Sequence, residues 1–342
     1  MKKIRIAIIG MGLMGTRHAQ LLSNMDKFEL VGMCDENITL EHKLHEFGVP
    51  FYNNVEKLIS ITKPHAVIIA TPNQTHLKVL EICTAYKIDV LIEKPISDSI
   101  ESSNKIIELS NSSDCNILIG HHRRYNNLIQ KLRSIIISGE IGNLVAVSAI
   151  WGIMKPKDYF VHEWRKNRPG GGPVLINLIH ELDILRYICG EVENIYSNLS
   201  SNIREYNVED SVAISMKFIN GALATIIGSD TVVSPWSYES NTSENLIYYY
   251  VPENCYYFMG DLGSIGFPKM EVWKYIDNNI GWQHPMKKFI KTVEIENPLI
   301  KQLEHFSDVI NGICPPMVTA TDAARSLSLA LAVLGFDKDN RV

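Results

Sequence analysis

Short apolar runs alternate with amphipathic segments along the first third of the chain. The apolar runs are almost continuous, which is typical of strands buried on both faces of a parallel sheet. They span residues 4–9, 28–34, 65–70, 89–92 and 116–120, and the segments of helical periodicity between them span 16–22, 40–47, 55–61, 74–86 and 99–110. We expect Asn73 to cap the helix 74–86. Strands that alternate with helices in this way predict an α/β domain over residues 1–120, with a doubly wound parallel sheet.

The pattern changes after Gly120. Helices are expected at 126–138, 174–189, 299–312 and 319–336, an irregular polar stretch at 154–173, and strands at 143–153, 193–201, 210–218, 221–230, 236–250, 255–259 and 269–275. Asn220-Gly221 between two alternating runs is a strong hairpin signal. Residues 121–342 are therefore predicted to form an α+β domain with a large, mostly antiparallel open sheet, and the final helices to pack back towards the first domain.

The composition narrows the class of protein. The chain has 342 residues, 46% of them hydrophobic, and a formal net charge of -5, which argues against a nucleic-acid surface. No apolar segment is long enough to span a membrane, and Arg5 with the glycines after it interrupts any signal peptide. The six cysteines are scattered without paired spacing, so we expect reduced thiols in a cytoplasmic protein.

Three glycines, Gly10, Gly12 and Gly15, follow the first apolar run. In a dinucleotide-binding βαβ unit the first permits a tight turn, the second lets backbone N–H groups approach a pyrophosphate, and the third lets helix and strand pack closely. The phosphates then lie at the helix N-terminus, where the helix dipole favours an anion. The alternative is a plain glycine loop beside a surface aspartate.

Asp35 ends the second apolar run, about twenty residues after Gly15, where an acidic group accepts hydrogen bonds from an adenosine ribose. Glu36 and Asn37 follow it and supply no cation. A 2′-phosphate would therefore meet negative charge. The sequence predicts NAD rather than NADP.

Lys94 follows the predicted strand 89–92, and in a doubly wound sheet ligands bind outside the carboxyl ends of the strands. The ammonium of a lysine next to an oxidised nicotinamide is destabilised by the positive ring, which lowers its pKa towards acid/base use. The alternative is an ordinary solvated loop lysine.

His180 lies on the predicted helix 174–189, off the apolar stripe of Leu175, Leu178, Ile179, Leu182 and Leu185. It is either a structural or surface group, or a catalyst whose tautomer Asp183 fixes.

Other polar and aromatic side chains are candidates for a pocket lining. Arg123 and Arg124 either line it or tie the two domains together, and Trp164 is either a sugar-stacking platform or part of the core. A carboxylate-bearing substrate becomes plausible if Arg165 or Arg168 faces the pocket. The pair His121-His122 lacks nearby cysteine and acidic groups, so no metal site is expected. The predicted substrate-binding residues are Lys94, His122, Arg123, Tyr125, Tyr159, Trp164, Arg165, Asn177 and His180.

Four ordered motifs resemble the Gfo/Idh/MocA family, which is named for glucose-fructose oxidoreductase, inositol dehydrogenase and a rhizopine-catabolism protein. They are the glycine motif, ATPNxxH ending at His76, EKP at 93–95 and GGGxxxxxxxHxxDxLRY at 170–187. The resemblance implies an N-terminal Rossmann domain, an α+β domain whose open sheet mediates dimers or tetramers, and roles for Lys94 and His180 on either side of the reacting carbon. We expect the cofactor to be bound by Gly10, Gly12, Leu13, Met14, Gly15, Asp35, Thr71, Pro72, Asn73, His76, Glu93 and Lys94.

One position departs from the family pattern. Sugar and inositol dehydrogenases of the family usually have an aspartate four residues before the histidine, and this chain has Ile176 there, followed by Asn177. Isoleucine cannot relay a proton. Either Lys94 and His180 suffice, or Asn177 contributes a hydrogen bond, or the substrate is not a simple polyol.

The sequence therefore predicts an NAD-dependent dehydrogenase that oxidises a secondary hydroxyl of a cyclic polyol, sugar or sugar derivative, or catalyses the reverse reduction. It acts on a small molecule as a homodimer or homotetramer. Two alternatives stay open: a dehydrogenase of a carboxylated cis-dihydrodiol, and a non-catalytic regulator that senses NAD or sugar with the same fold.

Overall fold

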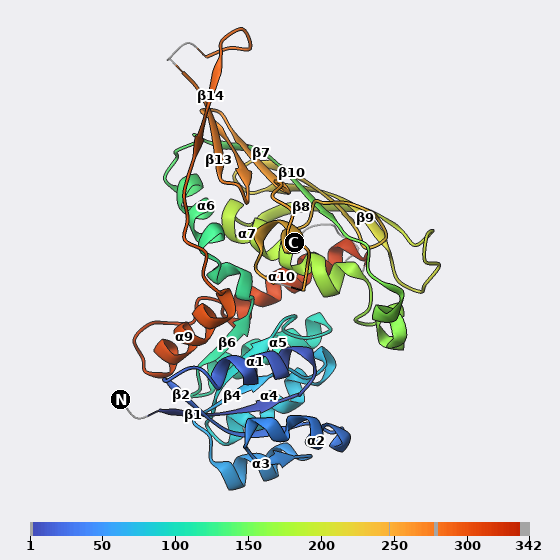
Figure 1. The fold of residues 1–342 in the computed structure, drawn as a ribbon, viewed down its shortest axis with the longest axis vertical. Helices are drawn as coiled ribbons and strands as arrows, with labels where there is room; N and C mark the ends of the chain where they lie inside the picture. Colours follow the sequence, from blue (N-terminus) through green and yellow to red (C-terminus); the bar gives the residue numbers. More distant parts are fainter. Residues whose placement is uncertain (1–2, 246, 277–279, 336–342) are drawn as a thin grey trace. The chain divides into compact units, whose positions relative to one another are not determined.

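The computed structural model describes residues 3–245, 247–276 and 280–335. The chain divides into two compact units. The first runs through His122 and also includes Leu299–Leu327, and the second comprises Arg123–Pro298 and the described residues from Ser328 on (Figure 1). The helix α9 (Pro298–Ile310) thus falls almost entirely in the first unit, and α10 (Ala320–Val333) contributes to both.

The first unit contains the predicted parallel sheet. Its six strands are all parallel and have the order β3-β2-β1-β4-β5-β6. They are β1 (Ile4–Ile9), β2 (Phe28–Cys34), β3 (Phe51–Tyr52), β4 (Ala66–Ile69), β5 (Asp89–Glu93) and β6 (Ile117–Gly120). Strand β4 in the middle of the sheet and β6 at its edge are fully buried, which explains their continuous apolar runs. Only the two-residue β3 is too short for a pattern in the sequence.

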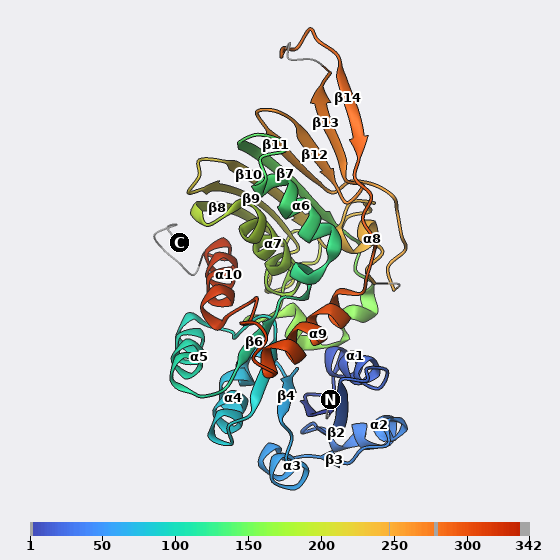
Figure 2. The same ribbon diagram turned by 90° about the vertical axis from the view of Figure 1, so that its left-hand side faces the viewer.

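Helices connect these strands in the predicted order. They are α1 (Leu13–Leu22), α2 (Glu41–Leu44), α3 (Val55–Thr62), α4 (His76–Ala85) and α5 (Ile100–Ser112). The side chains of Asn54 and Ser99 cap α3 and α5. The prediction that Asn73 caps α4 is wrong, because Asn73 begins the 3₁₀ turn η3 (Asn73–Thr75) that precedes this helix. Figure 2 shows α3, α4 and α5 beside the strands of this unit.

The second unit contains the predicted open sheet of eight strands, in the order β14-β13-β12-β11-β7-β10-β9-β8. Only β7 and β10 pair in parallel among the described strands of this sheet. The strands are β7 (Leu144–Gly152), β8 (Val192–Ser200), β9 (Ser211–Phe218), β10 (Leu223–Ser229), β11 (Tyr256–Gly260), β12 (Ser264–Phe267), β13 (Glu271–Tyr275) and β14 (Met286–Ile290). The predicted Asn-Gly hairpin joins β9 to β10, with Gly221 at φ +90°.

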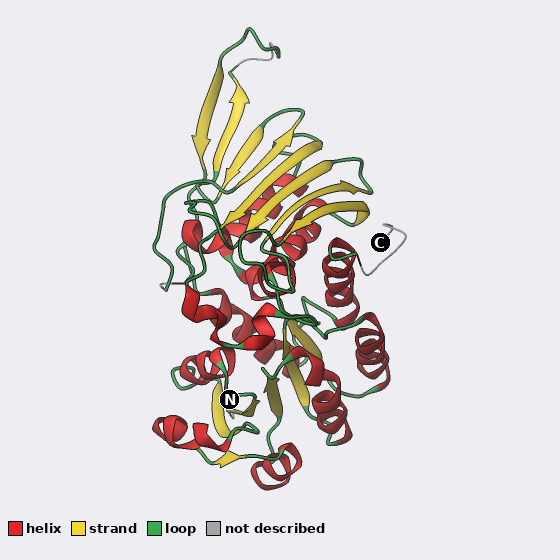
Figure 3. Cartoon of the chain, turned by 90° about the vertical axis from the view of Figure 1, so that its right-hand side faces the viewer, coloured by secondary structure: helices red, strands yellow, loops and turns green. Residues whose placement is uncertain are grey.

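Helices cover one face of this sheet (Figure 3). They are α6 (Asn127–Ile137), the π-helical turn η7 (Val174–Leu178) and its continuation α7 (Ile179–Cys189). The predicted irregular stretch contains only the 3₁₀ turns η5 (Lys157–Val161) and η6 (Glu163–Lys166), and η4 (His122–Tyr125) precedes α6.

One prediction for the second unit is wrong, and two strands, β12 and β14, were not predicted. The segment 236–250 was expected to be a strand, but it contains the helix α8 (Tyr238–Thr242), which begins because the Ser237 side chain accepts a hydrogen bond from the Ser240 N–H. The residues of β14 are all exposed, so no alternation of apolar and polar positions predicts this strand. The predicted end of the last helix at Phe336 lies outside the described residues.

Within the described residues, no helix combines the length and the hydrophobicity that crossing a bilayer requires. All six cysteines are described and none is paired with another.

Candidate active site

The glycine turn after β1 has the geometry that the motif predicts. Gly10 has φ +93°, and a Cβ there would lie 2.5 Å from the backbone of Ala70 and Thr71. A Cβ on Gly15 would lie 1.8 Å from the Gly10 carbonyl oxygen, so α1 packs against the turn only because Gly15 has no side chain. Around Gly12, by contrast, a Cβ would meet nothing within 4 Å. The protein leaves that space open for a ligand.

The N-terminus of α1 is equipped for an anion. Gly12 is its N-cap and supplies no capping side chain, and no acidic residue lies in the first turn. The first N–H groups of a helix have no acceptor within the helix, so a pyrophosphate satisfies them. Leu13 is 76% exposed at this end and Met14 is half-buried, so both flank the expected phosphate position.

Asp35 is held at the end of β2 by two backbone donors. Its Oδ2 accepts a hydrogen bond of 2.7 Å from the Met11 N–H, and its Oδ1 accepts one of 2.9 Å from the Asn37 N–H. The carboxylate therefore lies against the glycine turn and is half-buried. Each oxygen keeps a second lone pair, which suits two adjacent ribose hydroxyls.

The turns after β4 and β5 are joined by one buried side chain. His76, 1% exposed, makes contacts of 2.9 Å with the Thr71 carbonyl through Nε2 and of 3.2 Å with the Ile96 carbonyl through Nδ1. Burial lowers its pKa. His76 thus fixes the turn that carries Thr71, Pro72 and Asn73, and its own ring nitrogens are directed at protein carbonyls.

Glu93 ends β5, two strands from β1 in the sheet, and Lys94 follows it. Glu93 Oε1 lies 2.7 Å from Nε2 of the fully buried His18 on α1, and its Oε2 accepts a hydrogen bond of 3.3 Å from the Lys94 N–H. Burial by itself would raise the pKa of Glu93, but the hydrogen bond and charge of His18, then the charges of His122 and Lys94, hold it below the usual range. An ionised glutamate therefore links α1 to the turn of the half-buried Lys94.

His180 lies on α7 in the second unit and is 6% exposed. The helix is buried almost all round, which the apolar stripe did not reveal. Its polar side is buried against arginines. Arg124 donates to both oxygens of Asp183, at 2.9 and 2.6 Å, so Asp183 is first of all the partner of Arg124.

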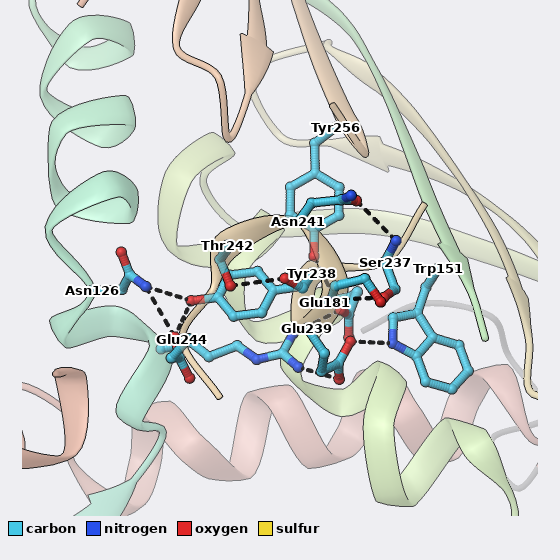
Figure 4. Close-up of polar contacts among 12 residues, drawn as sticks. Asn126, Trp151, Glu181, Ser237, Tyr238, Glu239, Asn241, Thr242, Glu244 and Tyr256 are labelled. Carbon is cyan, nitrogen blue, oxygen red and sulfur yellow. Dashed lines mark hydrogen bonds and ion pairs between the residues drawn. The ribbon is translucent and has the colours of Figure 1, made fainter. Parts of the chain in front are cut away.

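Arg123, 4% exposed, lies between two buried glutamates of the same unit. It donates 2.7 Å hydrogen bonds to Oε1 of Glu181 and to Oε1 of Glu239. Figure 4 shows Glu181 beside the Tyr256 hydroxyl, which donates to it, and Glu239 beside the Trp151 indole. The prediction that Arg123 lines the substrate pocket is therefore replaced by a structural role, and its ion pairs lie within the second unit. Tyr125, 5% exposed, is also buried.

Asn177 lies one helical turn before His180, and it and Ile176 are half-buried. Its Oδ1 accepts a 2.8 Å hydrogen bond from Nζ of Lys155, a buried residue that the sequence analysis missed. Lys155 follows β7 and lies 3.3 Å from Oδ2 of Asp230. Burial lowers the pKa of Lys155, and the charge of Asp230 opposes that shift. A lysine before a proline at the end of a strand, as in Lys94-Pro95, was the one signal for it in the sequence.

Tyr159, Trp164 and Arg165 lie close together in η5 and η6. The Arg165 guanidinium lies 4.1 Å from the ring centre of Tyr159 and 5.4 Å from that of Trp164. Trp164 is 52% exposed, so it is not part of the core. Among the described residues, no three His, Cys, Asp or Glu side chains come close enough to hold a metal ion.

The glycine turn, the uncapped helix end and Asp35 fit a dinucleotide, and the chain has a second unit built on a separate sheet. These features define an NAD-binding protein of the two-domain oxidoreductase class. Two family models match the chain, one described as an oxidoreductase family with an NAD-binding Rossmann fold over residues 4–121 and one as a GFO/IDH/MocA C-terminal domain over residues 129–265. The chain belongs to the Gfo/Idh/MocA family of oxidoreductases.

Individual relatives agree with this assignment. The chain is 28% identical over 239 residues to a myo-inositol 2-dehydrogenase of Thermotoga maritima, covering 67% of this chain and 70% of the relative. It is 25% identical over 337 residues to the rhizopine catabolism protein MocA of Rhizobium meliloti, covering 97% and 94%. The WlbA dehydrogenase of Bordetella pertussis, solved with NADH and UDP-GlcNAcA, has the same fold, with a TM-score of 0.81, 18% identity and coverage of 100% and 99% of the two chains.

Proposed function

We propose that this protein is an NAD-dependent dehydrogenase that oxidises a secondary hydroxyl of a cyclic polyol, sugar or sugar derivative, or catalyses the reverse reduction. The observation that carries the proposal is the place of Lys94 in the parallel sheet. Its strand β5 lies two strands from β1, so the Lys94 turn and the glycine turn share one sheet edge about 10 Å apart. Relatives named as inositol dehydrogenases support a cyclic polyol as one class of substrate.

The cofactor residues in this proposal belong to the first unit. The backbone from Gly10 to Gly15, including Leu13 and Met14, holds the pyrophosphate, and Asp35 holds the adenosine ribose. Because Asp35 is anionic and Glu36 follows it, NADP is disfavoured. The ends of β4 and β5 supply the residues expected near the nicotinamide, which are Thr71, Pro72, Asn73, Glu93 and Lys94. The buried side chain of His76 holds these two turns in place.

Lys94 and His180 are the acid/base pair of the proposed mechanism. Bound NAD supplies the hydride acceptor. Lys94 removes the proton of the substrate hydroxyl, and His180 assists it by a hydrogen bond to the same oxygen. Glu93 does not react; it accepts the Lys94 N–H and, through His18, fixes this turn to α1. The substrate contacts expected beyond these two residues come from His122, Tyr159, Trp164, Arg165 and Asn177.

The substitution Lys94→Met tests the mechanism. Turnover should fall by roughly 10²–10⁴-fold, the usual effect of losing an acid/base group. The affinity for NAD, measured by calorimetry, should stay nearly constant because the phosphate and ribose contacts lie elsewhere. Unchanged turnover would show that Lys94 is not the acid/base residue.

A substrate screen separates this function from its alternatives. The protein is mixed with NAD or NADP and with sugars, inositols, uronates and dihydrodiols, and NAD(P)H absorbance is followed. Oxidation of a dihydrodiol alone would replace the sugar assignment, and NAD binding without any turnover would favour a sensor. Equal use of NADP would contradict the role given to Asp35.

We also propose a homodimer or homotetramer formed through the open face of the eight-stranded sheet. The strand register places several half-exposed apolar side chains on one face, and charged residues are few among them. They include Leu223, Ile227, Tyr257, Met259 and Trp273, exposed by 57%, 52%, 41%, 38% and 38%. A contiguous apolar face of this kind is typical of an interface. Light scattering on the full chain should give a mass of two or four chains, and a monomer at micromolar concentration would contradict the proposal.

A cytoplasmic location is part of the same proposal. Five of the six cysteines are buried, and burial raises the pKa of the Cys34 and Cys83 thiols to about 12 in each case. Such thiols stay protonated and inert at neutral pH. Unpaired, inert thiols suit a reducing compartment.

A further inference from the structure

A group of basic side chains in the second unit includes Arg165, so far named only as an expected substrate contact, and two residues to which the mechanism above gives no role. Lys155, Arg165 and Arg204 line one small hollow together with Ile176, the residue that stands where the family usually has an aspartate. Two of these cations lie on the same aromatic ring. Lys155 Nζ is 4.6 Å and Arg165 Cζ is 4.1 Å from the ring centre of Tyr159. We call Lys155, Arg165 and Arg204 the basic cluster.

The acidic groups around the basic cluster are already engaged. Asp230 is shared by Lys155, at 3.3 Å, and Arg204, at 3.0 Å. Glu209 pairs with Arg168 and also accepts the Val174 N–H. Asp210 accepts the backbone N–H groups of 203 and 204. Arg165 is therefore the member of the cluster that has no acidic partner among the described residues.

Arg165 is nevertheless held in one place. Its Nη1 donates a 2.6 Å hydrogen bond to the Tyr159 carbonyl, and its guanidinium stacks on the Tyr159 ring. Its Nε is buried and has no hydrogen-bond partner in the described part of the chain. A buried N–H donor without an acceptor is costly, and a guanidinium pairs with a carboxylate through two parallel hydrogen bonds. The side chain is thus oriented and lacks the anion that would complete it.

Lys155 determines which end of the Asn177 amide points away from it. Because an ammonium can only donate, the atom at 2.8 Å from Lys155 Nζ must be the amide oxygen of Asn177. The Asn177 Nδ2 group is then directed away from Lys155, and it makes no hydrogen bond to any described residue. Asn177 precedes His180 by three residues, so both lie on neighbouring positions of one helix face. This helix therefore offers the substrate a hydrogen-bond donor from Asn177, the residue after Ile176.

We propose that the substrate carries a carboxylate, that Arg165 binds this carboxylate, and that Lys155 is a positioning residue that orients Asn177 towards an acceptor oxygen of the same molecule. The inference rests on the dehydrogenase function proposed above and narrows its substrate class to sugar acids and related ring carboxylates. Neutral sugars and inositols lack the group that would satisfy Arg165.

Matched pairs of substrates test this proposal. Glucuronate and galacturonate are compared with glucose and galactose, in steady-state kinetics with NAD and in calorimetry with the NADH-bound protein. The wild-type protein should bind and oxidise an acid in preference to its neutral partner. Arg165→Met should raise KM and Kd for the acid by about 10- to 100-fold, the usual effect of losing a charge-assisted hydrogen bond, with little change in kcat. Arg165→Lys should recover part of the affinity.

Arg133→Met is the matched control. Arg133 also donates to a tyrosine carbonyl and stacks on the same residue's ring, Tyr187, at 4.5 Å, but it lies outside the basic cluster. It should leave the preference for acids unchanged. Lys155→Met should weaken acids and neutral sugars alike, because it releases the Asn177 amide, and Asn177→Asp should shift the preference towards neutral polyols.

The calorimetric measurement of binding tests the carboxylate site separately from the dehydrogenase function. Acid binding that depends on Arg165 without any turnover would contradict the dehydrogenase and keep the carboxylate site. A wild-type protein that prefers the neutral partners, that binds neither member of any pair, or whose Arg165→Met variant loses both members equally would overturn the carboxylate site.

Discussion

Each of the two proposed acid/base residues has a buried glutamate as its neighbour in the chain, and the two glutamates differ in their electrostatics. Glu93 precedes Lys94 in the first unit, and Glu181 follows His180 in the second. They are 4% and 0% exposed. The pKa of Glu93 lies below the usual range for a glutamate, whereas that of Glu181 is raised by burial and by the charge of Glu239, against the effect of Arg123.

The partners explain the opposite directions. Glu93 has His18 on one oxygen and the Lys94 N–H on the other, and further positive charge nearby. Glu181 shares its one cation, Arg123, with a second carboxylate, and its Oε2 has no hydrogen-bond partner among the described residues. Burial is therefore not enough to predict the charge of a glutamate. The neighbouring charges decide it, because groups that can carry positive charge surround Glu93, whereas Glu181 lies beside a second carboxylate, Glu239.

Arg123→Met should have the largest effect on this comparison. It leaves Glu181 and Glu239 buried without their shared cation, and removal of one partner of a buried ion pair costs about 3–5 kcal/mol. Urea unfolding of the full chain measures the loss. Arg133→Met, which removes an arginine with a carbonyl and a ring as partners, should cost only about 1 kcal/mol. Equal losses of stability in the two variants would show that Arg123 is not needed to neutralise Glu181 and Glu239.

The two Glu→Gln substitutions should differ in the free energy of unfolding by a smaller amount than the two arginine variants do. Glu93→Gln removes an ionised acceptor from His18 and should lower the free energy of unfolding by about 1–3 kcal/mol. Glu181→Gln replaces a carboxyl whose charged form is disfavoured by burial and by Glu239, so the substitution should cost less, about 1 kcal/mol or below. Thermal unfolding at pH 7 compares the variants. A larger loss for Glu181→Gln would reverse the assignment of charge.

The pH dependence should be the smallest effect and opposite in sign for the two residues. Because the folded pKa of Glu93 is depressed, its contribution is present above the ordinary value of 4.5 and is lost as pH falls through the folded pKa. Because that of Glu181 is raised, its contribution is present below 4.5 and is lost as pH rises towards the folded pKa. The Tm deficit of Glu93→Gln should therefore shrink below pH 4.5. Glu181→Gln should gain relative to the wild type as pH rises above 4.5, and parallel Tm profiles would contradict both assignments.

Some of the site could be predicted because its signals are local. The glycine turn lies within six consecutive residues. Gly10 is required by the close backbone of Ala70 and Thr71 and Gly15 by the Gly10 carbonyl, while the space beside Gly12 is open. Lys94 was placed at the sheet edge by strand order alone, since parallel strands share one carboxyl edge. The alternation of β9 and β10 and the Asn-Gly hairpin are local in the same sense.

Other features depend on residues distant in the sequence. Lys155 meets Asn177 and Asp230 only after β7, η7 and the end of β10 are brought together. Arg123 resembled a pocket arginine until its glutamates, at 181 and 239, were located beside it. The helix α8 was missed because five residues are too few to show a helical period, while the Ser237 cap and the hydrogen bond from Thr242 to the Tyr238 carbonyl favour a helix.

The sequence by itself determined the parallel sheet, the dinucleotide turn, the family resemblance and the positions of Lys94 and His180 in their elements, because periodicity and short motifs express backbone constraints within a few residues. Only the tertiary structure decided which charges are neutralised. Arg123 and Arg124 form ion pairs with carboxylates of their own unit. Arg165 contacts the carbonyl and the ring of Tyr159 and has no acidic partner among the described residues. Ion pairing is a matter of distance in space, which the order of residues along a chain does not specify.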